Sequence, residues 1–172
     1  MARPPLVVLC AILAALLAGC GGAPPASDAD DVPVRVDRVF IDSHDAPVVV
    51  LEEQNGPRWL PIWIGTAEAR SIALQIAEHT SPRPNSHDLT RDLIRGLDGA
   101  VDRVVVTELR AGTYYAVLGI VRDGKTVEID ARPSDAIAIA LRDGAPIFVR
   151  ASLFEDVASD EDAEIALPER EI

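Results

Sequence analysis

Hydrophobic and polar residues follow two kinds of pattern along the chain, and each kind predicts a different element. Alternation of the two, or a short unbroken apolar run, predicts a strand. Strands are expected over 34–41, 47–51, 59–64, 103–109, 113–122, 126–131 and 146–150. The pair Asn55-Gly56 favours a type I′ turn between the second and third of these strands. Turns at 111–112 and 123–124 make the fourth, fifth and sixth strands a meander of antiparallel neighbours.

Apolar residues at helical spacing predict the helices. The first helix is expected to start at Thr66 and the second at Ser86, and each of these residues can cap its helix. Pro133 opens a third helix of small apolar residues that Gly144 stops, and Leu153 starts a weak fourth helix. Strand runs interrupted by helix runs favour an α+β fold, with a single domain, a largely antiparallel or mixed sheet and about three to four helices.

Length and charge limit what the domain can be. The 172 residues allow one domain with extended ends, and a hydrophobic content of 48% favours a folded core. The formal net charge of −12 argues against a basic nucleic-acid binder. That charge is concentrated at the ends, since residues 155–172 hold eight acidic residues and a single arginine. Residues 32–154 hold 17 acidic and 14 basic residues, a net charge of −3 that is compatible with a small phosphate site.

The N-terminal residues predict an export signal. An apolar run over 6–17 is too short to span a membrane and suits the core of a signal peptide. It is followed by Ala18-Gly19-Cys20, and with the preceding leucine this ending resembles the lipobox of bacterial lipoproteins, in which the cysteine is lipidated. An ordinary secretory signal or an uncleaved anchor is the alternative. The expected location is the bacterial cell envelope outside the cytoplasm, with a lipid anchor to the membrane at Cys20.

The chain is therefore expected to have four parts. These are a signal peptide over 1–19, a lipidated flexible tether over 20–31, a folded domain over 32–154 and an acidic, disordered tail over 155–172. Both cysteines lie in the first twenty residues, so the domain is expected to contain no cysteine zinc site and no disulfide framework. The sequence lacks the motifs of serine hydrolases, P-loop nucleotide triphosphatases, dinucleotide-binding enzymes and zinc peptidases.

The junction between the sixth strand and the third helix carries the strongest candidate chemistry. Asp130 ends the strand, Pro133 begins the helix, and free backbone N–H groups at such a helix start bind anions. Arg132 and Ser134 can bind phosphate there, and Asp135 can be a dipole-stabilised cap or a ligand of a hard cation. The structural alternative has Ser134 and Asp135 as helix caps and Asp130 as the ion-pair partner of the arginine.

A second loop enters the helix at Ser86. His87 can act as a general base or acid at neutral pH, and Asp88 can orient it or bind a cation. Arg83 is the candidate phosphate-binding residue of this loop. The structural alternative has Ser86 and Asp88 stabilising the helix start while His87 is exposed.

A third junction, between the strand over 59–64 and the first helix, contains Glu68. Trp59 and Trp63 share one face of that strand. They can form a platform on which bases stack, and the structural alternative is that they pack against a helix.

These junctions belong to four segments whose order and spacing are distinctive. The segments are 61–65 with 68–69, then 83–89, 129–138 and 146–149, and the stretch Asp-Ala-Arg-Pro-Ser-Asp-Ala is the most specific of them. Together they resemble the bifunctional nuclease domain family of bacteria and plants, over roughly residues 32–155. Members of that family are described as degrading both DNA and RNA on an α+β fold. The resemblance therefore implies a nuclease with DNA or RNA as its substrate.

Phosphodiester hydrolysis needs an activated water and positive charge near the phosphate. Asp130 and Asp135 are expected to hold Mg²⁺ or Mn²⁺, with Glu68 as a further ligand. His87 is expected to be the general base or acid, with Asp88 beside it. The rival hypothesis is a non-catalytic exported module that binds a partner protein or an anionic ligand through the same helix starts. The oligomeric state, a homo-oligomer included, is left open.

Overall fold

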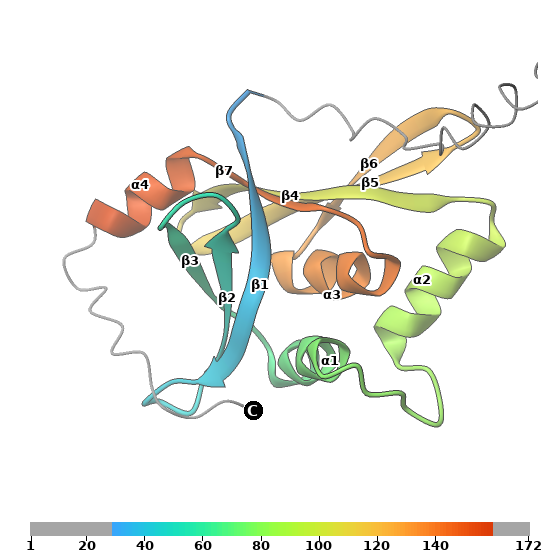
Figure 1. Ribbon diagram of the computed structural model, residues 1–172, viewed down its shortest axis with the longest axis horizontal. Helices are drawn as coiled ribbons and strands as arrows, with labels where there is room; N and C mark the ends of the chain where they lie inside the picture. Colours follow the sequence, from blue (N-terminus) through green and yellow to red (C-terminus); the bar gives the residue numbers. More distant parts are fainter. Residues whose placement is uncertain (1–28, 160–172) are drawn as a thin grey trace, which may run out of the picture.

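The computed structural model describes residues 29–159 and shows one mixed sheet with helices packed against it (Figure 1). Its strands are β1 (Asp31–Ile41), β2 (Pro47–Glu53), β3 (Trp59–Trp63), β4 (Ala100–Arg110), β5 (Thr113–Arg122), β6 (Lys125–Ala131) and β7 (Ile147–Arg150). Its helices are α1 (Thr66–Ile76), α2 (Ser86–Gly96), α3 (Pro133–Asp143) and α4 (Ser152–Ser159). The predicted α+β class, with a mixed sheet in a single domain, is confirmed.

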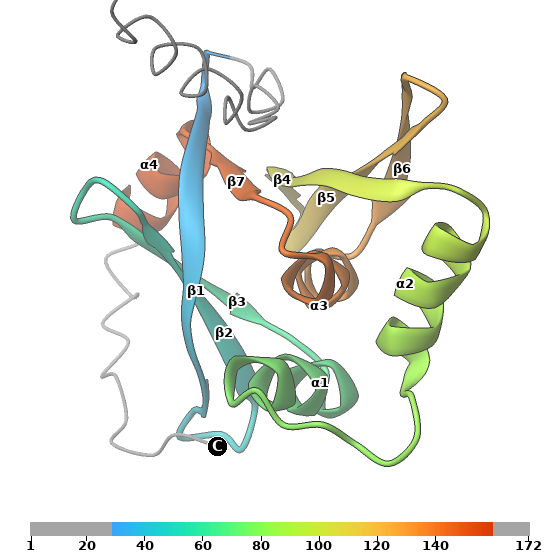
Figure 2. The same cartoon turned by 45° about the vertical axis from the view of Figure 1, so that its right-hand side comes forward.

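The strand order is β3-β2-β1-β7-β4-β5-β6, so the last strand in sequence lies at the centre of the sheet. β7 pairs antiparallel with β1 and parallel with β4, and every other neighbouring pair is antiparallel. Within the described residues, β7 is therefore the connection between β1–β2–β3 on one side and β4–β5–β6 on the other. Seen from a second direction, the sheet bends so that these two groups form walls on either side of α3 (Figure 2).

The bend has a local cause in the strands themselves. The pairing of β1 with β2 shifts register once, and the pairing of β4 with β5 shifts register twice. Such irregularities increase the local twist of a strand and bend the sheet. The long strands β1 and β4 can therefore curve around the helix that lies between the two walls.

Helix α3 occupies the middle of the hydrophobic core. Its small apolar residues Ala136, Ile137, Ala138 and Ala140 are fully buried, and α3 contacts α1, α2, β4 and β5. Pro133 starts the helix, and Gly144 ends it with φ of 69°, the left-handed conformation that glycine adopts at low cost. Both predicted ends of α3 are confirmed, so its first turn has a fixed position in the fold.

The N-cap of α2 is Asn85, one residue before the predicted Ser86. The Asn85 side chain accepts hydrogen bonds from the N–H groups of His87 at 2.9 Å and Asp88 at 3.0 Å. In return, the Asp88 carboxylate accepts from the Asn85 N–H at 2.8 Å, which completes a capping box. The capping box needs its acidic residue three positions after the cap, and Asp88 satisfies this spacing only from Asn85.

The turn between β2 and β3 is wider than predicted, although the hairpin itself is confirmed. The Glu53 N–H donates to the Arg58 carbonyl at 2.9 Å, which encloses a four-residue loop. Neither Asn55 nor Gly56 has the positive φ that a type I′ turn requires, so that prediction is wrong. Two hydrogen bonds of 2.8 and 2.9 Å between the Arg58 guanidinium and the Glu53 carboxylate close the wider loop. The two other predicted tight turns have positive φ at both central residues.

The described part of the chain extends the predicted domain at both ends. β1 begins at Asp31, inside the predicted tether, and α4 continues to Ser159, so the start of the predicted tail is helical. Leu153 and Phe154 are 1% and 5% exposed, and their burial anchors this helix. The predicted signal peptide, Cys20 and the remainder of the tether and tail lie outside the described residues.

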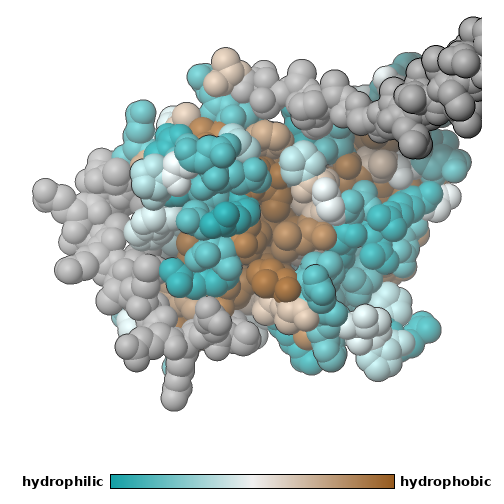
Figure 3. Space-filling model, viewed as in Figure 1, coloured by the Kyte–Doolittle hydropathy of each residue, from teal (hydrophilic) through white to brown (hydrophobic). Residues whose placement is uncertain are grey.

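Helix α2 is attached to the domain by its first turn, by Ile94 and by the ion pair of Arg95 with Asp143, while its leucines are exposed. Leu89, Leu93 and Leu97 are 54%, 57% and 62% exposed, and no residue of α2 is fully buried. Elsewhere on the surface, apolar residues gather in the middle of the face seen in Figure 1, with hydrophilic residues around them (Figure 3). No helix within residues 29–159 is both long enough and apolar enough to cross a membrane.

Candidate active site

Polar side chains from the starts of α1, α2 and α3 form one connected network. Glu68 lies in the first turn of α1, Asp88 in the first turn of α2 and Asp135 in the first turn of α3. Hydrogen bonds and ion pairs link, in order, Glu68, Arg132, Asp135, His87, Ser71, Arg142 and Asp88. The fold therefore brings together the three junctions that the sequence singled out. The contact between Glu68 and Arg132 joins residues that are 64 positions apart in the sequence.

Arg132 is held between two carboxylates at the N-cap of α3. Its Nη2 donates to Glu68 Oε1 at 2.6 Å and its Nε donates to Asp135 Oδ2 at 2.7 Å. These bonds, first that to Asp135 and then that to Glu68, raise the pKa of Arg132 above its usual value. The side chain is still 66% exposed, and its Nη1 has no partner among the described residues. Arg132 therefore presents an oriented N–H edge to solvent.

Asp135 connects the exposed arginine to the interior. Its Oδ1 lies 3.2 Å from Nε2 of His87, and both of its oxygens accept from Arg132. Burial raises the pKa of Asp135, but the hydrogen bonds from Arg132 and His87 outweigh this effect, and the pKa lies below its usual value. The carboxylate is 32% exposed, so Asp135 is an ionised group that solvent can reach at neutral pH.

The imidazole of His87 is engaged at both ring nitrogens. Nδ1 lies 2.9 Å from Ser71 Oγ, Nε2 faces Asp135, and the side chain is 12% exposed. Serine, histidine and aspartate in a row have the order of a nucleophilic triad, but Ser71 is only 4% exposed. Its hydroxyl also accepts a hydrogen bond from Arg142, so it is a buried structural contact and is not open to a substrate.

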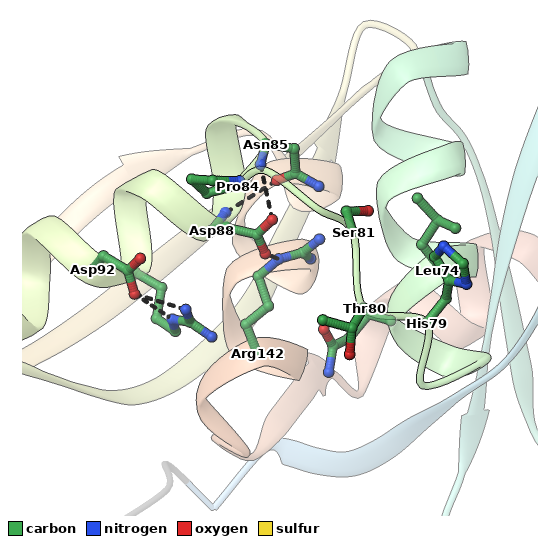
Figure 4. Close-up of a pocket in the computed structure, with 11 residues that line it drawn as sticks. Leu74, His79, Thr80, Ser81, Pro84, Asn85, Asp88, Asp92 and Arg142 are labelled. Carbon is green, nitrogen blue, oxygen red and sulfur yellow. Dashed lines mark hydrogen bonds and ion pairs between the residues drawn. The ribbon is translucent and has the colours of Figure 1, made fainter.

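Arg142 brings a guanidinium into the core of the domain. Its Nε donates to Asp88 Oδ1 at 2.6 Å, its Nη1 to the Ala138 carbonyl at 2.7 Å and its Nη2 to Ser71 Oγ at 2.9 Å. Figure 4 shows the side chain reaching from α3 to Asp88 at the start of α2. Burial raises the pKa of Asp88, but the hydrogen bonds from the Asn85 N–H and from Arg142 outweigh it, and the pKa lies below its usual value. Arg142 thus ties α1, α2 and α3 together.

Two pockets open beside this network. The Arg142 pocket has a volume of about 350 Å³ and lies between the end of α1 and the start of α2 (Figure 4). Arg142 is the residue of α3 that lines it. The Arg132 pocket has a volume of about 370 Å³ and is lined by the β3–α1 junction, the β4–β5 turn and the start of α3. Arg132 and Ser134 both line the second pocket.

The Arg132 pocket has the features of an anion site. Ser134 is 6% exposed, and its hydroxyl has no partner among the described residues. The N-cap of α1 is Gly65 rather than the predicted Thr66, and neither α1 nor α3 has a side-chain cap. A helix start without such a cap leaves N–H groups of the first turn unpaired at the positive end of the helix dipole. In α3 this is the N–H of Ser134, because Pro133 has no N–H and the Asp135 N–H donates to the Arg132 carbonyl. Two such starts border one pocket, which favours an anionic ligand there.

Two predicted site residues of the domain lie outside both the network and the two pockets. Asp130 is exposed on β6, where it pairs in register with Val117, and its charge acts on Arg110. It forms no ion pair with Arg132, because β6 ends before the chain turns into α3 and the two side chains follow different elements. Arg83 is exposed in the loop before α2 and lines neither of the two pockets.

The carboxylates that were expected to hold a metal ion are arranged differently from that expectation. Glu68 and Asp135 share the guanidinium of Arg132, which already supplies the positive charge between them. Asp130 lies elsewhere on β6. Among residues 29–159, no three histidine, cysteine, aspartate or glutamate side chains are grouped so that they could hold a metal ion. The residues as placed do not fit the three-ligand site that the sequence predicted.

Ser71, Asn85 and Arg142 are parts of the network that were not assigned a role from the sequence. Ser71 and Arg142 are polar residues within otherwise apolar helical faces, and a buried polar residue of that kind needs a partner. Asn85 stands three residues before Asp88, the spacing of a capping box. These signals indicate that each residue makes a contact, but they do not identify the contact.

Comparison with known proteins identifies the family. A family model described as the bifunctional nuclease domain matches residues 49–162. This chain belongs to the bifunctional nuclease domain family. The matched region contains the starts of α1, α2 and α3, and therefore the whole network from Glu68 to Arg142.

Individual relatives extend from bacteria to plants. A protein of Mycobacterium tuberculosis, described as uncharacterized in each of two strains, is 43% identical over 146 residues, which is 81% of this chain and 87% of the relative. Bifunctional nuclease 1 of Oryza sativa is 30% identical over 112 residues, which is 63% of this chain and 34% of the rice protein. The resemblance seen in the four sequence segments is confirmed at the level of the family.

Proposed function

We propose that this protein hydrolyses phosphodiester bonds of DNA or RNA in the Arg132 pocket. The family and the name of the rice relative support this class of reaction. The observation that carries the proposal is the clamped Arg132, an oriented guanidinium edge at a pocket of about 370 Å³ beside two carboxylates. Phosphodiester hydrolysis needs positive charge for the phosphate and an acceptor that orients water, and both are available at this point.

The phosphate group binds at Arg132 and at the start of α3 in this proposal. Arg132 Nη1 donates to a phosphate oxygen while Nε and Nη2 stay bound to Asp135 and Glu68. The hydroxyl and the backbone N–H of Ser134, in the first turn of α3, donate to other phosphate oxygens. These donors stabilise the negative charge that develops on the phosphate during attack, and loss of one such donor costs about 100- to 1000-fold in rate. Arg83 has no role in this proposal.

Asp135 is the group that orients the attacking water and accepts its proton in this proposal. The water oxygen bonds to phosphorus as the bond from phosphorus to the leaving sugar oxygen breaks, and that oxygen takes a proton from solvent. The Asp135 carboxylate is ionised at neutral pH, and its partial exposure gives water access to it. Glu68, on the other side of Arg132, is the second acceptor. His87, predicted as the general base or acid, has both ring nitrogens in contacts within the protein. We therefore propose that it acts through Asp135 by holding that carboxylate in place.

A requirement for Mg²⁺ or Mn²⁺ stays a prediction from the sequence. The described side chains do not form a metal site on their own, so no step of the proposed reaction depends on a metal. Assays with added Mg²⁺, added Mn²⁺ and chelator measure whether the reaction needs one.

The test is cleavage of labelled single-stranded DNA and RNA by the full chain. The wild type is expected to cleave, and Asp135→Asn is expected to lose at least about 100-fold in rate because the acceptor of the water proton is removed. Asp123→Asn is the matched control, since Asp123 is an 84% exposed turn residue outside the network. Wild-type rates in both Asp135→Asn and His87→Ala would show that the proposed site is wrong. Failure of the wild type to cleave under every metal condition would overturn the nuclease proposal.

The second candidate is a non-catalytic module that binds an anionic ligand in the same pocket. The observation that favours it is the closure of the network: Arg132 already pairs with two carboxylates, and His87 has no free ring nitrogen. This candidate predicts that oligonucleotides bind to the full chain and remain intact. The cleavage assay, combined with a binding measurement on the same samples, separates the two candidates.

We also propose that the domain is tethered to a membrane of the bacterial cell envelope by a lipid at Cys20. The proposal rests on the lipobox-like ending of the apolar run before Cys20. Several acyl chains, at about 0.8 kcal/mol per buried methylene, form a stable anchor. Cys20→Ser is expected to move the protein from the membrane fraction to the soluble fraction after cell lysis, and Cys10→Ser serves as the control. A Cys20→Ser protein that still sediments with membranes would rule out this anchor.

A further inference from the structure

The hydroxyl of Ser71 has three polar neighbours, and together they determine where its proton points. Asn85 Nδ2 lies 3.1 Å from Ser71 Oγ, Arg142 Nη2 lies 2.9 Å from it, and His87 Nδ1 lies 2.9 Å from it. A serine hydroxyl can accept two hydrogen bonds and donate one. The roles of the three neighbours therefore follow once it is known which of them can only donate.

Two of the three neighbours are donors at this contact. A guanidinium has no acceptor, so Arg142 can only donate to Ser71 Oγ. The orientation of the Asn85 amide is fixed by its capping role, because its Oδ1 accepts the N–H groups of His87 and Asp88. The amide nitrogen of Asn85 must then be the atom that faces Ser71. Both acceptor positions of Ser71 Oγ are occupied.

The single hydrogen of the Ser71 hydroxyl is left for His87. It is donated to Nδ1, which must be unprotonated to accept it. The ring proton then sits on Nε2, where it is donated to Asp135 Oδ1 at 3.2 Å. The contacts are mutually consistent only for this tautomer, because a proton on Nδ1 would face an oxygen whose acceptor positions are already used.

We infer that Ser71, Asn85 and Arg142 are positioning residues that hold His87 as its Nε2–H tautomer, with the ring proton aimed at Asp135. The effect of this on catalysis rests on the proposed function, whereas the tautomer itself does not. In this arrangement Nε2 is a donor and cannot take a proton from water. Asp135 remains the proton acceptor, and the hydrogen bond from His87 sets the direction of its carboxylate.

The isosteric substitution Asn85→Asp tests the inference. Asn85→Asp keeps the side-chain oxygen that caps α2 but replaces the Nδ2 donor with an acceptor. The Ser71 hydroxyl is then expected to donate to the new carboxylate, and Ser71 Oγ becomes an acceptor for a proton on His87 Nδ1. The substitution should therefore move a proton onto Nδ1 without disturbing the helix cap.

The measurement is two-dimensional NMR of the ring nitrogens in full-length protein labelled with ¹⁵N-histidine. The chain has three histidines, so His44→Gln and His79→Gln assign the signals of His87 by elimination. Wild type is expected to show a protonated Nε2 and an unprotonated Nδ1. Asn85→Asp is expected to show a protonated Nδ1, and Asn55→Asp, the same chemical change in the exposed β2–β3 turn, is expected to match wild type. A wild-type Nδ1 that carries a proton would overturn the inference.

Ser71→Ala provides a second test that does not depend on a new charge. Without the hydroxyl, Nδ1 loses its donor, and the two tautomers are expected to become mixed. If Ser71→Ala and Asn85→Asp both leave the wild-type ring pattern unchanged, Ser71 does not hold the tautomer and the inference is wrong. Circular dichroism on the same samples distinguishes a tautomer change from loss of fold.

Kinetics separate this inference from the proposed function. If the wild type is a nuclease, Asn85→Asp is expected to lower kcat by about tenfold or more and to change KM less than twofold, because the carboxylate direction changes while the phosphate donors stay in place. Rescue is expected in Ser71→Thr relative to Ser71→Ala, since threonine restores the hydroxyl. A wild type without cleavage activity would overturn the proposed function and leave the tautomer result standing. A changed tautomer with an unchanged kcat would show that Ser71, Asn85 and Arg142 do not position the groups that carry out the reaction.

Discussion

At the scale of single residues, Arg142 shows how a charged side chain can hold a core together. Its guanidinium side chain is 3% exposed and bonds to atoms of α1, α2 and α3. Most of the cost of burying its charge is offset by Asp88 and by carbonyl and hydroxyl acceptors. The same contacts leave Asp88 and Ser71 dependent on Arg142.

Replacement of Arg142 is therefore expected to be severe. Arg142→Met keeps most of the side-chain volume but leaves the half-buried Asp88 carboxylate without its cation, which should lower the free energy of unfolding by about 3–5 kcal/mol. Arg35→Met is the control, because Arg35 pairs with Glu52 while 61% exposed and should cost less than about 1 kcal/mol. Urea unfolding followed by circular dichroism measures both. Equal losses in the two variants would contradict this account.

The two network aspartates make stability depend on pH in the acid range. The pKa values of Asp88 and Asp135 are lowered in the folded protein below the ordinary value of 3.8. Groups of this kind stabilise the fold above the unfolded-state pKa, and that stability is lost as pH falls toward the folded-state pKa. The free energy of unfolding is therefore expected to fall as pH is lowered below about 4. Asp88→Asn is expected to show a smaller fall between pH 5 and pH 3 than Asp123→Asn, as measured by urea unfolding at each pH.

The residues of the candidate site divide into those that the sequence could indicate and those that only the fold reveals. Arg132, Asp135 and His87 stand at helix starts, where local chemistry and the family resemblance both single them out. Ser71 and Arg142 meet across 71 residues of chain, and no local pattern indicates which polar side chain each will contact. Asp130 is predicted in the site because it stands at the end of a strand that leads into the third helix, although its strand carries it elsewhere.

At the scale of elements, the ends of α3 depend on residues that act locally. Gly144 at the C-cap has φ of 69°, and a Cβ added there would meet no atom within 4 Å. The cost of Gly144→Ala is therefore purely conformational, about 1 kcal/mol or more of unfolding free energy. Gly96→Ala, at the last position of α2, also meets no atom within 4 Å and is not at positive φ. It is expected to stabilise by about 0.4–1 kcal/mol, so thermal unfolding should shift in opposite directions for the two variants.

Predictions succeeded for elements where the signal is carried by neighbouring residues. Pro133, Gly144 and the two tight turns act through their own backbone conformations, so the sequence sufficed for them. The turn at Asn55 differs because the ion pair of Arg58 with Glu53 closes a wider loop. α2 differs because its polar first turn, Ile94 and the ion pair of Arg95 with Asp143 attach it to the domain, while its leucines stay exposed. Both differences arise from side-chain contacts that the local sequence pattern does not reveal.

At the scale of the whole molecule, the short strand β7 joins the two halves of the sheet. β7 has four residues and lies between β1 and β4, whereas β6 has seven residues and lies at the edge. Burial follows position, since Val149 of β7 is fully buried and Val127 of β6 is 56% exposed. Strand order could not be derived from the sequence because β7 is apolar on both faces and carries no sign of its partners.

A matched pair of substitutions measures this difference. Val149→Thr places a hydroxyl without a partner in the centre of the sheet and is expected to cost about 1–3 kcal/mol of unfolding free energy. Val127→Thr makes the same chemical change on the exposed edge and is expected to stay within about 0.5 kcal/mol of wild type. Chemical denaturation of both proteins provides the values. A cost at Val127 equal to that at Val149 would mean that edge and centre contribute alike.

The central position of β7 also determines when the protein can fold. A ribosome synthesises the chain from its N-terminus, so β7 is the last strand to emerge, and until then β1 and β4 each have an unpaired side. The hairpin of β2 and β3 and the meander of β4 to β6 can form early because their contacts are local. The complete sheet, and with it the core around α3, can form only after residue 150 has been synthesised. Folding of this domain is therefore completed only after β7 has been made, so the nascent domain stays open until then.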